Sequence, residues 1–172
     1  MCNIMKRLLL FILLLVPYLC LAQSNQELAV DFMAMKDAAE KGNIALVKSL
    51  LNKGINPNGY TFKETPTKET YFSQQTDRPI HVASEEGHLE IVKLLLEHKA
   101  DPSWCCCSCV TALHLAIQAN HVDITRLLLA NGADPNIVHD LEVDSFGLAQ
   151  KYGNNEMIEL LKKYKSSTKT AK

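Results

Sequence analysis

The sequence has no excess of charge of either sign. Its 172 residues include 18 lysines and arginines against 19 aspartates and glutamates, which gives a formal net charge of −1. Domains that bind nucleic acid usually carry a basic face that neutralises phosphate groups. We therefore expect no nucleic-acid partner.

The sequence also lacks the short motifs that mark common enzyme sites. It contains no glycine-rich phosphate loop, no GxSxG elbow and no HExxH pair. No candidate nucleophile has an evident base or oxyanion-stabilising group beside it. We therefore expect a protein that is not an enzyme and uses no cofactor. The composition, with 47% hydrophobic and 22% charged residues, is instead typical of one soluble domain.

Residues 1–22 are predicted to be a secretory signal peptide. A short basic start at Lys6 and Arg7 precedes an apolar run over Leu8–Val16, and the segment ends at the small residue Ala22. The apolar run is about half of the roughly 20 residues that a membrane-spanning helix needs. We therefore expect cleavage after Ala22 and no stable membrane span in the mature protein.

The mature chain is expected to begin at Gln23 and to enter a periplasm or the extracellular space. An alternative is a lipoprotein in which Cys20, preceded by Leu19, becomes the acylated first residue. Pro17 and Tyr18 fit that motif poorly. Plain export, either periplasmic or secreted, is therefore the favoured interpretation.

The rest of the chain contains an internal repeat of 33 residues. Ser84–Pro102 (SEEGHLEIVKLLLEHKADP) returns as Ile117–Pro135 (IQANHVDITRLLLANGADP), and weaker copies occupy Ala39–Pro57 and Gln150–Tyr164. A unit this short cannot bury its apolar face alone, so at least three must stack to form a core. The four copies therefore predict a solenoid.

Each unit is predicted to contain two helices around a tight turn. In the second unit the first helix lies around Ile80–Ser84, the turn is at Gly87, and Leu89–Leu96 carries apolar residues at helical spacing. The expected core side chains of the second helices are Leu89, Val92, Leu95, Leu96, Val122, Leu127, Leu128 and Leu129. Gly132 is expected to end the second helix of the third unit.

The two ends of the stack are predicted to differ from its middle. Gln26–Glu40 has the pattern of an amphipathic helix that caps the N-terminal end of the stack. Its expected inward side chains are Leu28, Phe32, Met35 and Ala38 or Ala39. At the other end, residues 166–172 are expected to form a flexible polar tail, because their side chains offer nothing to bury.

The repeated motifs resemble those of the ankyrin-repeat family. RPIHVAS (Arg78–Ser84) and TALHLAI (Thr111–Ile117) match the family's TPLHLAA element, and KADPS (Lys99–Ser103) and GADPN (Gly132–Asn136) match its GADVN ending. The resemblance covers roughly residues 34–164. It implies an all-α solenoid whose L-shaped helix-turn-helix units each carry two antiparallel helices and a protruding hairpin finger.

The resemblance divides residues 23–165, the predicted ankyrin-repeat domain, into four repeats. Their approximate ranges are 31–62, 74–106, 107–139 and 140–165. The first repeat lacks the TPLH element, and the fourth replaces it with DSFG at Asp144–Gly147. Terminal repeats usually depart from the consensus in this way, because they cap the stack.

The first interval of the repeat is 12 residues too long. The turns at Gly42 and Gly87 are 45 residues apart, and the excess falls in a loop inserted at about 60–75 in the first finger. The loop contains four aromatic residues, Tyr60, Phe62, Tyr71 and Phe72. These side chains either pack against one another or serve as anchors for a partner.

The resemblance implies a structural role for four of the six histidines. His81 and His114 occupy the TPLH position, where the family uses the imidazole to hydrogen-bond neighbouring loops. His88 and His121 directly follow the turn between the two helices of a unit. We therefore do not assign these four side chains to catalysis.

Four cysteines lie within five residues in the finger between the second and third units, in the sequence WCCCSC at Trp104–Cys109. Neighbouring cysteines are poorly placed for a disulfide, because consecutive Cα atoms are about 3.8 Å apart. Cys105 or Cys106 could instead bridge to Cys109 across the finger. A bridge between molecules and cysteines without a function also stay open.

Metal binding is a further alternative for this cluster. The candidate ligands are Cys105, Cys106, Cys107 and Cys109. Soft thiolates suit Cu(I) and Zn(II), but so short a loop would enclose a tetrahedral zinc ion with difficulty. A Cu(I) site with two or three ligands is therefore the more plausible form of this alternative.

The predicted function is protein–protein interaction, because the resemblance implies a scaffold whose exposed residues recognise a partner. We expect a monomer that binds another protein in a concave groove formed by fingers and first helices. By resemblance, the variable contact positions are Gln74, Gln75, Asp77, Glu85, Glu86, His98, Cys107, Ser108, Val110, Gln118, Ala119, Asn131, Asp140, Leu141, Val143, Lys151 and Tyr152. The alternative is a metal- or redox-responsive protein that uses the Cys105–Cys109 cluster.

Overall fold

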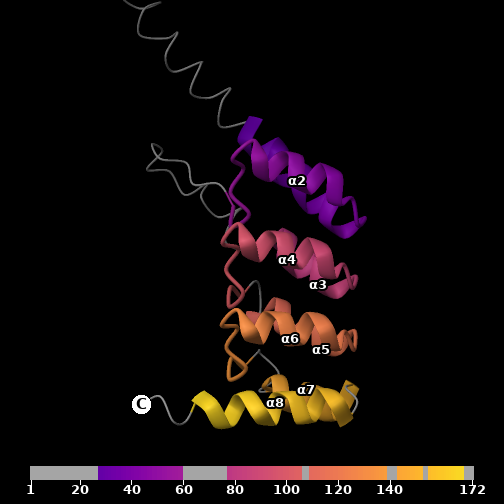
Figure 1. Ribbon diagram of the computed structural model, residues 1–172, viewed down its shortest axis with the longest axis vertical. Helices are drawn as coiled ribbons and strands as arrows, with labels where there is room; N and C mark the ends of the chain where they lie inside the picture. Colours follow the sequence, from indigo (N-terminus) through magenta and orange to yellow (C-terminus); the bar gives the residue numbers. More distant parts are fainter. Residues whose placement is uncertain (1–26, 60–76, 106–108, 139–142, 153–154, 169–172) are drawn as a thin grey trace, which may run out of the picture.

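The computed structural model describes residues 27–59, 77–105, 109–138, 143–152 and 155–168. Eight helices lie in these residues, stacked as pairs along the long axis of the molecule (Figure 1). The same residues contain no β-strand apart from an isolated antiparallel bridge between Cys105 and Thr111. None of these helices is long and apolar enough to cross a membrane. The predicted all-α solenoid is therefore confirmed.

The helices form two layers. The first helices of the units are residues 27–40, α3 (Pro79–Glu85), α5 (Ala112–Gln118) and α7 (Ser145–Tyr152). The second helices are α2 (Ile44–Asn52), α4 (Leu89–Glu97), α6 (Val122–Ala130) and α8 (Asn155–Thr168). Within the first layer α3 packs against α5 and α5 against α7, while α2, α4, α6 and α8 pack in sequence in the second. Each unit therefore contacts its neighbours through both layers.

The core runs continuously through the stack and is formed by both helix layers. Val92, Leu95, Leu128 and Leu129 are buried as predicted. The prediction was wrong for Leu89, Leu96, Val122 and Leu127, which are only partly buried and pack at the edge of the core. Ile91 and Ile124 take the central places instead. Apolar residues cover more of each second helix than stacking buries, so the periodicity alone did not identify the most deeply buried positions.

The opening helix, residues 27–40, buries Phe32, Met35, Ala38 and Ala39 as predicted. The prediction was wrong for Leu28, whose side chain is 44% exposed. Leu28 shares a helix face with Phe32, but it lies in the first turn, where α2 has already ended at Asn52. The apolar face of the opening helix is thus longer than the core that covers it.

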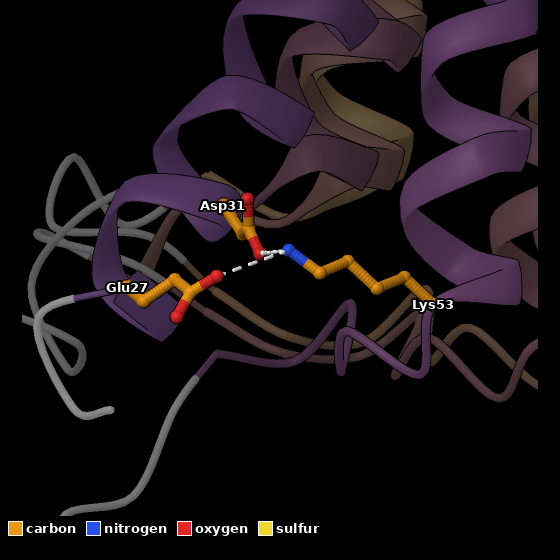
Figure 2. Close-up of polar contacts among 3 residues, drawn as sticks. All are labelled: Glu27, Asp31 and Lys53. Atoms are coloured by element: carbon orange, nitrogen blue, oxygen red, sulfur yellow. Dashed lines mark hydrogen bonds and ion pairs between the residues drawn. The ribbon is translucent and has the colours of Figure 1, made fainter. Parts of the chain in front are cut away.

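A lysine of the first unit joins the opening helix to the end of α2 (Figure 2). Lys53 Nζ lies 2.6 Å from Asp31 Oδ2 and 3.6 Å from Glu27 Oε1. The hydrogen bond to Asp31 raises the pKa of Lys53 above its usual value. Because Lys53 and Glu27 are exposed to water and Asp31 is only partly buried, the contact adds little stability.

The second helices α2, α4 and α6 are each followed by a residue with positive φ, at Gly54, Lys99 and Gly132. Gly132, with φ +89°, donates its N–H to the Leu129 carbonyl at 3.2 Å, and Ala133 donates to Leu128 at 3.0 Å. Gly132 therefore ends α6 in a Schellman motif, as predicted. Lys99 holds the same place after α4 with φ 64°, a conformation that favours glycine.

Replacing Leu95 or Leu128 by alanine is expected to destabilise the protein by about 2–5 kcal/mol, because each change opens a cavity in a fully buried place. Urea and thermal unfolding followed by circular dichroism measure the loss. The exposed Lys93 provides a control on α4, and Lys93→Ala is expected to change stability by less than about 0.5 kcal/mol. Unchanged unfolding of both leucine variants would contradict the stacking register.

Candidate functional site

Two histidines join the turn of one unit to the preceding unit. His88 Nε2 lies 3.0 Å from the carbonyl oxygen of Glu40, and His121 Nε2 lies 3.0 Å from that of Glu85. Each carbonyl group belongs to the last residue of the preceding first helix. The imidazole N–H donates to a carbonyl group that has no partner inside its own helix. These bonds fix the C-terminal ends of the first helices relative to one another.

The glycines of these turns make room for the histidines. A Cβ atom on Gly42 would lie 2.8 Å from His88 Cε1, and one on Gly87 would lie 2.6 Å from His121 Cε1. Both glycines also have positive φ, +71° and +81°. Glycine is therefore required at these two turns for conformational and steric reasons.

His81 and His114, the histidines of the TPLH position, join the first helices α3 and α5 to the fingers that follow them. His81 Nε2 lies 3.1 Å from the Trp104 carbonyl oxygen, and His114 Nε2 lies 3.0 Å from that of Ile137. In both residues Nδ1 accepts a backbone N–H from three residues earlier, so Nε2 carries the hydrogen and donates. Both side chains are buried, and burial lowers the pKa of His81 below its usual value. Their implied structural role is confirmed.

A buried arginine and an asparagine connect the first and second fingers. Arg78 is only 7% exposed and lies over the Trp104 ring, with Cζ 3.5 Å from the ring centroid. Its Nη1 donates to Asn58 Oδ1 at 3.2 Å, which also accepts the Asp101 N–H at 2.8 Å. Asn58 Nδ2 donates to the Lys99 carbonyl at 2.7 Å. Asn58 thus joins two fingers directly.

Ser103 makes the equivalent connection between the second and third fingers. Its Oγ donates to the Gly132 carbonyl at 3.3 Å and accepts the Asp134 N–H at 3.1 Å. Asn58 and Ser103 occupy the same place in the repeat, directly after its proline. The sequence reasoning did not assign either residue. A polar side chain that recurs at the same position after that proline was the signal that could have found them.

Six of the predicted contact residues lie at the C-terminal ends of the first helices. All six side chains are exposed. Because α3 packs on α5 and α5 on α7, these ends form one surface, which we name the helix-end row. Its residues are Glu85, Glu86, Gln118, Ala119, Lys151 and Tyr152. Tyr152 is 42% exposed, and Lys151 Nζ lies 4.8 Å from the centroid of its ring.

None of the other predicted contact residues that the structure describes lies at the C-terminal end of a first helix. Asp77, Val110 and Val143 are partly exposed, and each lies two residues before the start of a first helix. His98 and Asn131 follow the second helices α4 and α6, so the structure does not place them in the helix-end row. Gln74, Gln75, Cys107, Ser108, Asp140 and Leu141 lie outside the described residues.

Two cysteines of the finger between the second and third units face one another. Cys105 and Cys109 are free thiols whose Sγ atoms lie 2.7 Å apart. Contact with Cys109, followed by burial, raises the pKa of the Cys105 thiol. Cys106 and Cys107 lie outside the described residues. Within the part of the chain that the structure describes, no three histidine, cysteine, aspartate or glutamate side chains come together as a metal site.

Comparison with protein families identifies the repeats. A family model described as ankyrin repeats in three copies matches residues 35–139, which is more than half of the chain. No curated protein matches the sequence. The matched range contains the histidine contacts between units and the contacts between fingers. It also contains the helix ends of the second and third units.

Truncation of His81 to alanine is expected to cost about 1–3 kcal/mol at pH 7.5, because it leaves a buried N–H and a buried carbonyl group without a partner. The cost is also expected to depend on pH. Because the pKa of His81 is lower in the folded protein than the value of about 6.5 in the unfolded chain, its stabilising effect is complete above pH 6.5. The effect decreases as the pH falls towards the folded pKa.

Urea unfolding of both proteins between pH 5 and pH 7.5 tests this dependence. The two proteins differ only at residue 81, so the difference between the two curves isolates the contribution of His81. We expect the stability advantage of the unmodified protein to shrink below pH 6.5. A difference that stays constant, or grows, across this range would refute the assignment of a neutral buried imidazole.

Proposed function

Because this chain belongs to the ankyrin-repeat family, we propose that it binds another protein and catalyses no reaction. Units of this family generally act as protein–protein interaction modules. The observation that supports a specific surface is the helix-end row, where six exposed side chains lie on first helices that pack against one another. Asp77, Val110 and Val143 lie at the opposite, N-terminal ends of the first helices and offer further partly exposed side chains on the finger side.

The backbone beneath the helix-end row is held in place before any partner arrives. The carbonyl group of Glu85 accepts a hydrogen bond from His121, which fixes the end of α3 against the next unit. On the finger side, His81 and His114 hold the loops. A surface that is already ordered loses less conformational entropy on binding, so more of the contact energy contributes to affinity.

The chemistry of the helix-end row changes along the stack. The second unit contributes the carboxylates of Glu85 and Glu86, and the third contributes the small or neutral side chains of Gln118 and Ala119. The fourth contributes a cation and an aromatic ring. A complementary partner would place basic groups opposite α3 and an acidic group beside an apolar contact opposite α7. Opposite charges at the two ends would also fix the orientation of the partner.

Affinity purification of the full chain from a lysate and an envelope extract of its own source tests this proposal. We expect a stoichiometric protein partner, identified by mass spectrometry. The variant Glu85→Lys/Glu86→Lys/Tyr152→Ala is expected to reduce its retention at least tenfold, because it reverses the charge at one end of the row and removes the aromatic ring at the other.

A matched variant distinguishes the helix-end row from the rest of the surface. Glu90 and Glu97 are exposed on the second helix α4 of the same unit. The variant Glu90→Lys/Glu97→Lys reverses the same amount of charge and is expected to retain the partner. Circular dichroism confirms that both variants are folded. Equal retention by the two variants would exclude the helix-end row as the binding surface.

We further propose that the protein is exported by residues 1–22. The support is the basic start, the short apolar run and the small residue Ala22. The intact mass of the protein isolated from its source is expected to correspond to residues 23–172. A chain that begins at an acylated Cys20 would show a lipoprotein instead, and a mass that includes residues 1–22 would contradict cleavage.

A further inference from the structure

We propose that Cys105 and Cys109 form a disulfide bond that closes the finger between the second and third units. The two sulfur atoms are 2.7 Å apart. This separation lies between the length of a disulfide bond, about 2.05 Å, and the usual separation of non-bonded heavy atoms, about 3.5–4.0 Å. The backbone therefore already brings the two thiols into the position that a bond requires.

The backbone on both sides of the pair explains this position. Cys105 forms an antiparallel bridge with Thr111, so the two sides of the finger meet beside the cysteines. Cys109 has φ 58°, a left-handed backbone conformation that is typical of tight turns. Both thiols are only partly buried, so an oxidant can reach them. The pairing is thus set by the path of the finger and not by chance contact at the surface.

The residues next to the pair, the partly buried Trp104 and the buried Thr111, hold the finger in this conformation. Trp104, which precedes Cys105, stacks with Arg78 and accepts a hydrogen bond from His81 through its carbonyl group. Thr111, on the other side, is buried and hydrogen-bonded to His114. The two sides of the finger are therefore fixed by residues of two units, which limits the movement of the two sulfur atoms.

Bond formation requires a disulfide oxidant, such as a thiol–disulfide oxidoreductase or oxidised glutathione. The thiolate of one cysteine attacks the oxidant, breaks its S–S bond and releases one thiolate. The second cysteine then attacks the resulting mixed disulfide and releases the other. Two electrons pass from the cysteines to the oxidant, and the two thiol protons go to the released thiolates. This bond does not depend on the identity of a binding partner.

Paired variants of the full chain test the assignment. In a background with Cys2→Ser and Cys20→Ser, one variant carries Cys106→Ser/Cys107→Ser and keeps the proposed pair. Its matched control carries Cys105→Ser/Cys109→Ser and keeps the two neighbouring cysteines. Each protein is treated with oxidised glutathione and then with N-ethylmaleimide, and intact mass counts the remaining thiols. Non-reducing electrophoresis detects bridges between molecules.

The first variant is expected to lose both reactive thiols and the mass of two hydrogen atoms at every protein concentration, because the bond forms within one molecule. The control is expected to keep its thiols or to gain glutathione, since neighbouring cysteines are poorly placed for a bond. Two free thiols, stable glutathione adducts or disulfide-linked dimers in the first variant would overturn the proposal.

The single tryptophan of the chain provides a second measurement, made on the chain with all of its cysteines. Trp104 directly precedes Cys105, and a disulfide bond beside an indole ring quenches its fluorescence. We expect the fluorescence of the unmodified chain to decrease reversibly in oxidising glutathione buffers, with no such change in the Cys105→Ser/Cys109→Ser control. The same change in both proteins, or in neither, would also overturn the assignment.

Discussion

Each unit of this chain has an apolar face that it cannot bury by itself, and the stacking that covers this face determines the other contacts. Ile91, Leu95, Ile124 and Leu128 are fully covered only because units lie on both sides of them. Once the spacing of the units is set, polar groups at equivalent positions of neighbouring units lie close enough to form hydrogen bonds. The histidine contacts and the finger contacts of Asn58 and Ser103 follow from that spacing, and they restrict it further.

The proposed binding surface is a product of the same geometry. Stacking uses the sides of the first helices and leaves the side chains at their C-terminal ends exposed. The backbone carbonyl group of Glu85 is bound by His121, whereas its carboxylate stays available to a partner. The backbone of Glu85 therefore takes part in stacking, whereas its side chain is free to take part in the proposed recognition. This separation allows the exposed side chains to vary without a cost to the stack.

The repeat period and the TPLH motif were sufficient to predict the solenoid, the role of His81 and the end of α6 at Gly132. They could not place Leu28, because its exposure depends on where a neighbouring helix ends. Leu89 and Leu96 were assigned to the core because leucine occurs on more of the helix surface than stacking covers. Asn58 and Arg78 were missed because their contacts join fingers that are 20 or more residues apart, across the inserted loop.

The turn contacts also determine the order of the repeats, which are not interchangeable despite their similarity. Gly42 and Gly87 are each followed by a unit whose histidine occupies the space that a Cβ atom would need. Asn120 holds the same place in the third unit, and the next unit has Asn154 where the second and third units have His88 and His121. A duplicated third unit would therefore bring a histidine against Asn120. Lengthening of this array by duplication of the third unit would require a change to glycine at that turn, whereas duplication of the second unit would not, because Gly87 already leaves space for the histidine.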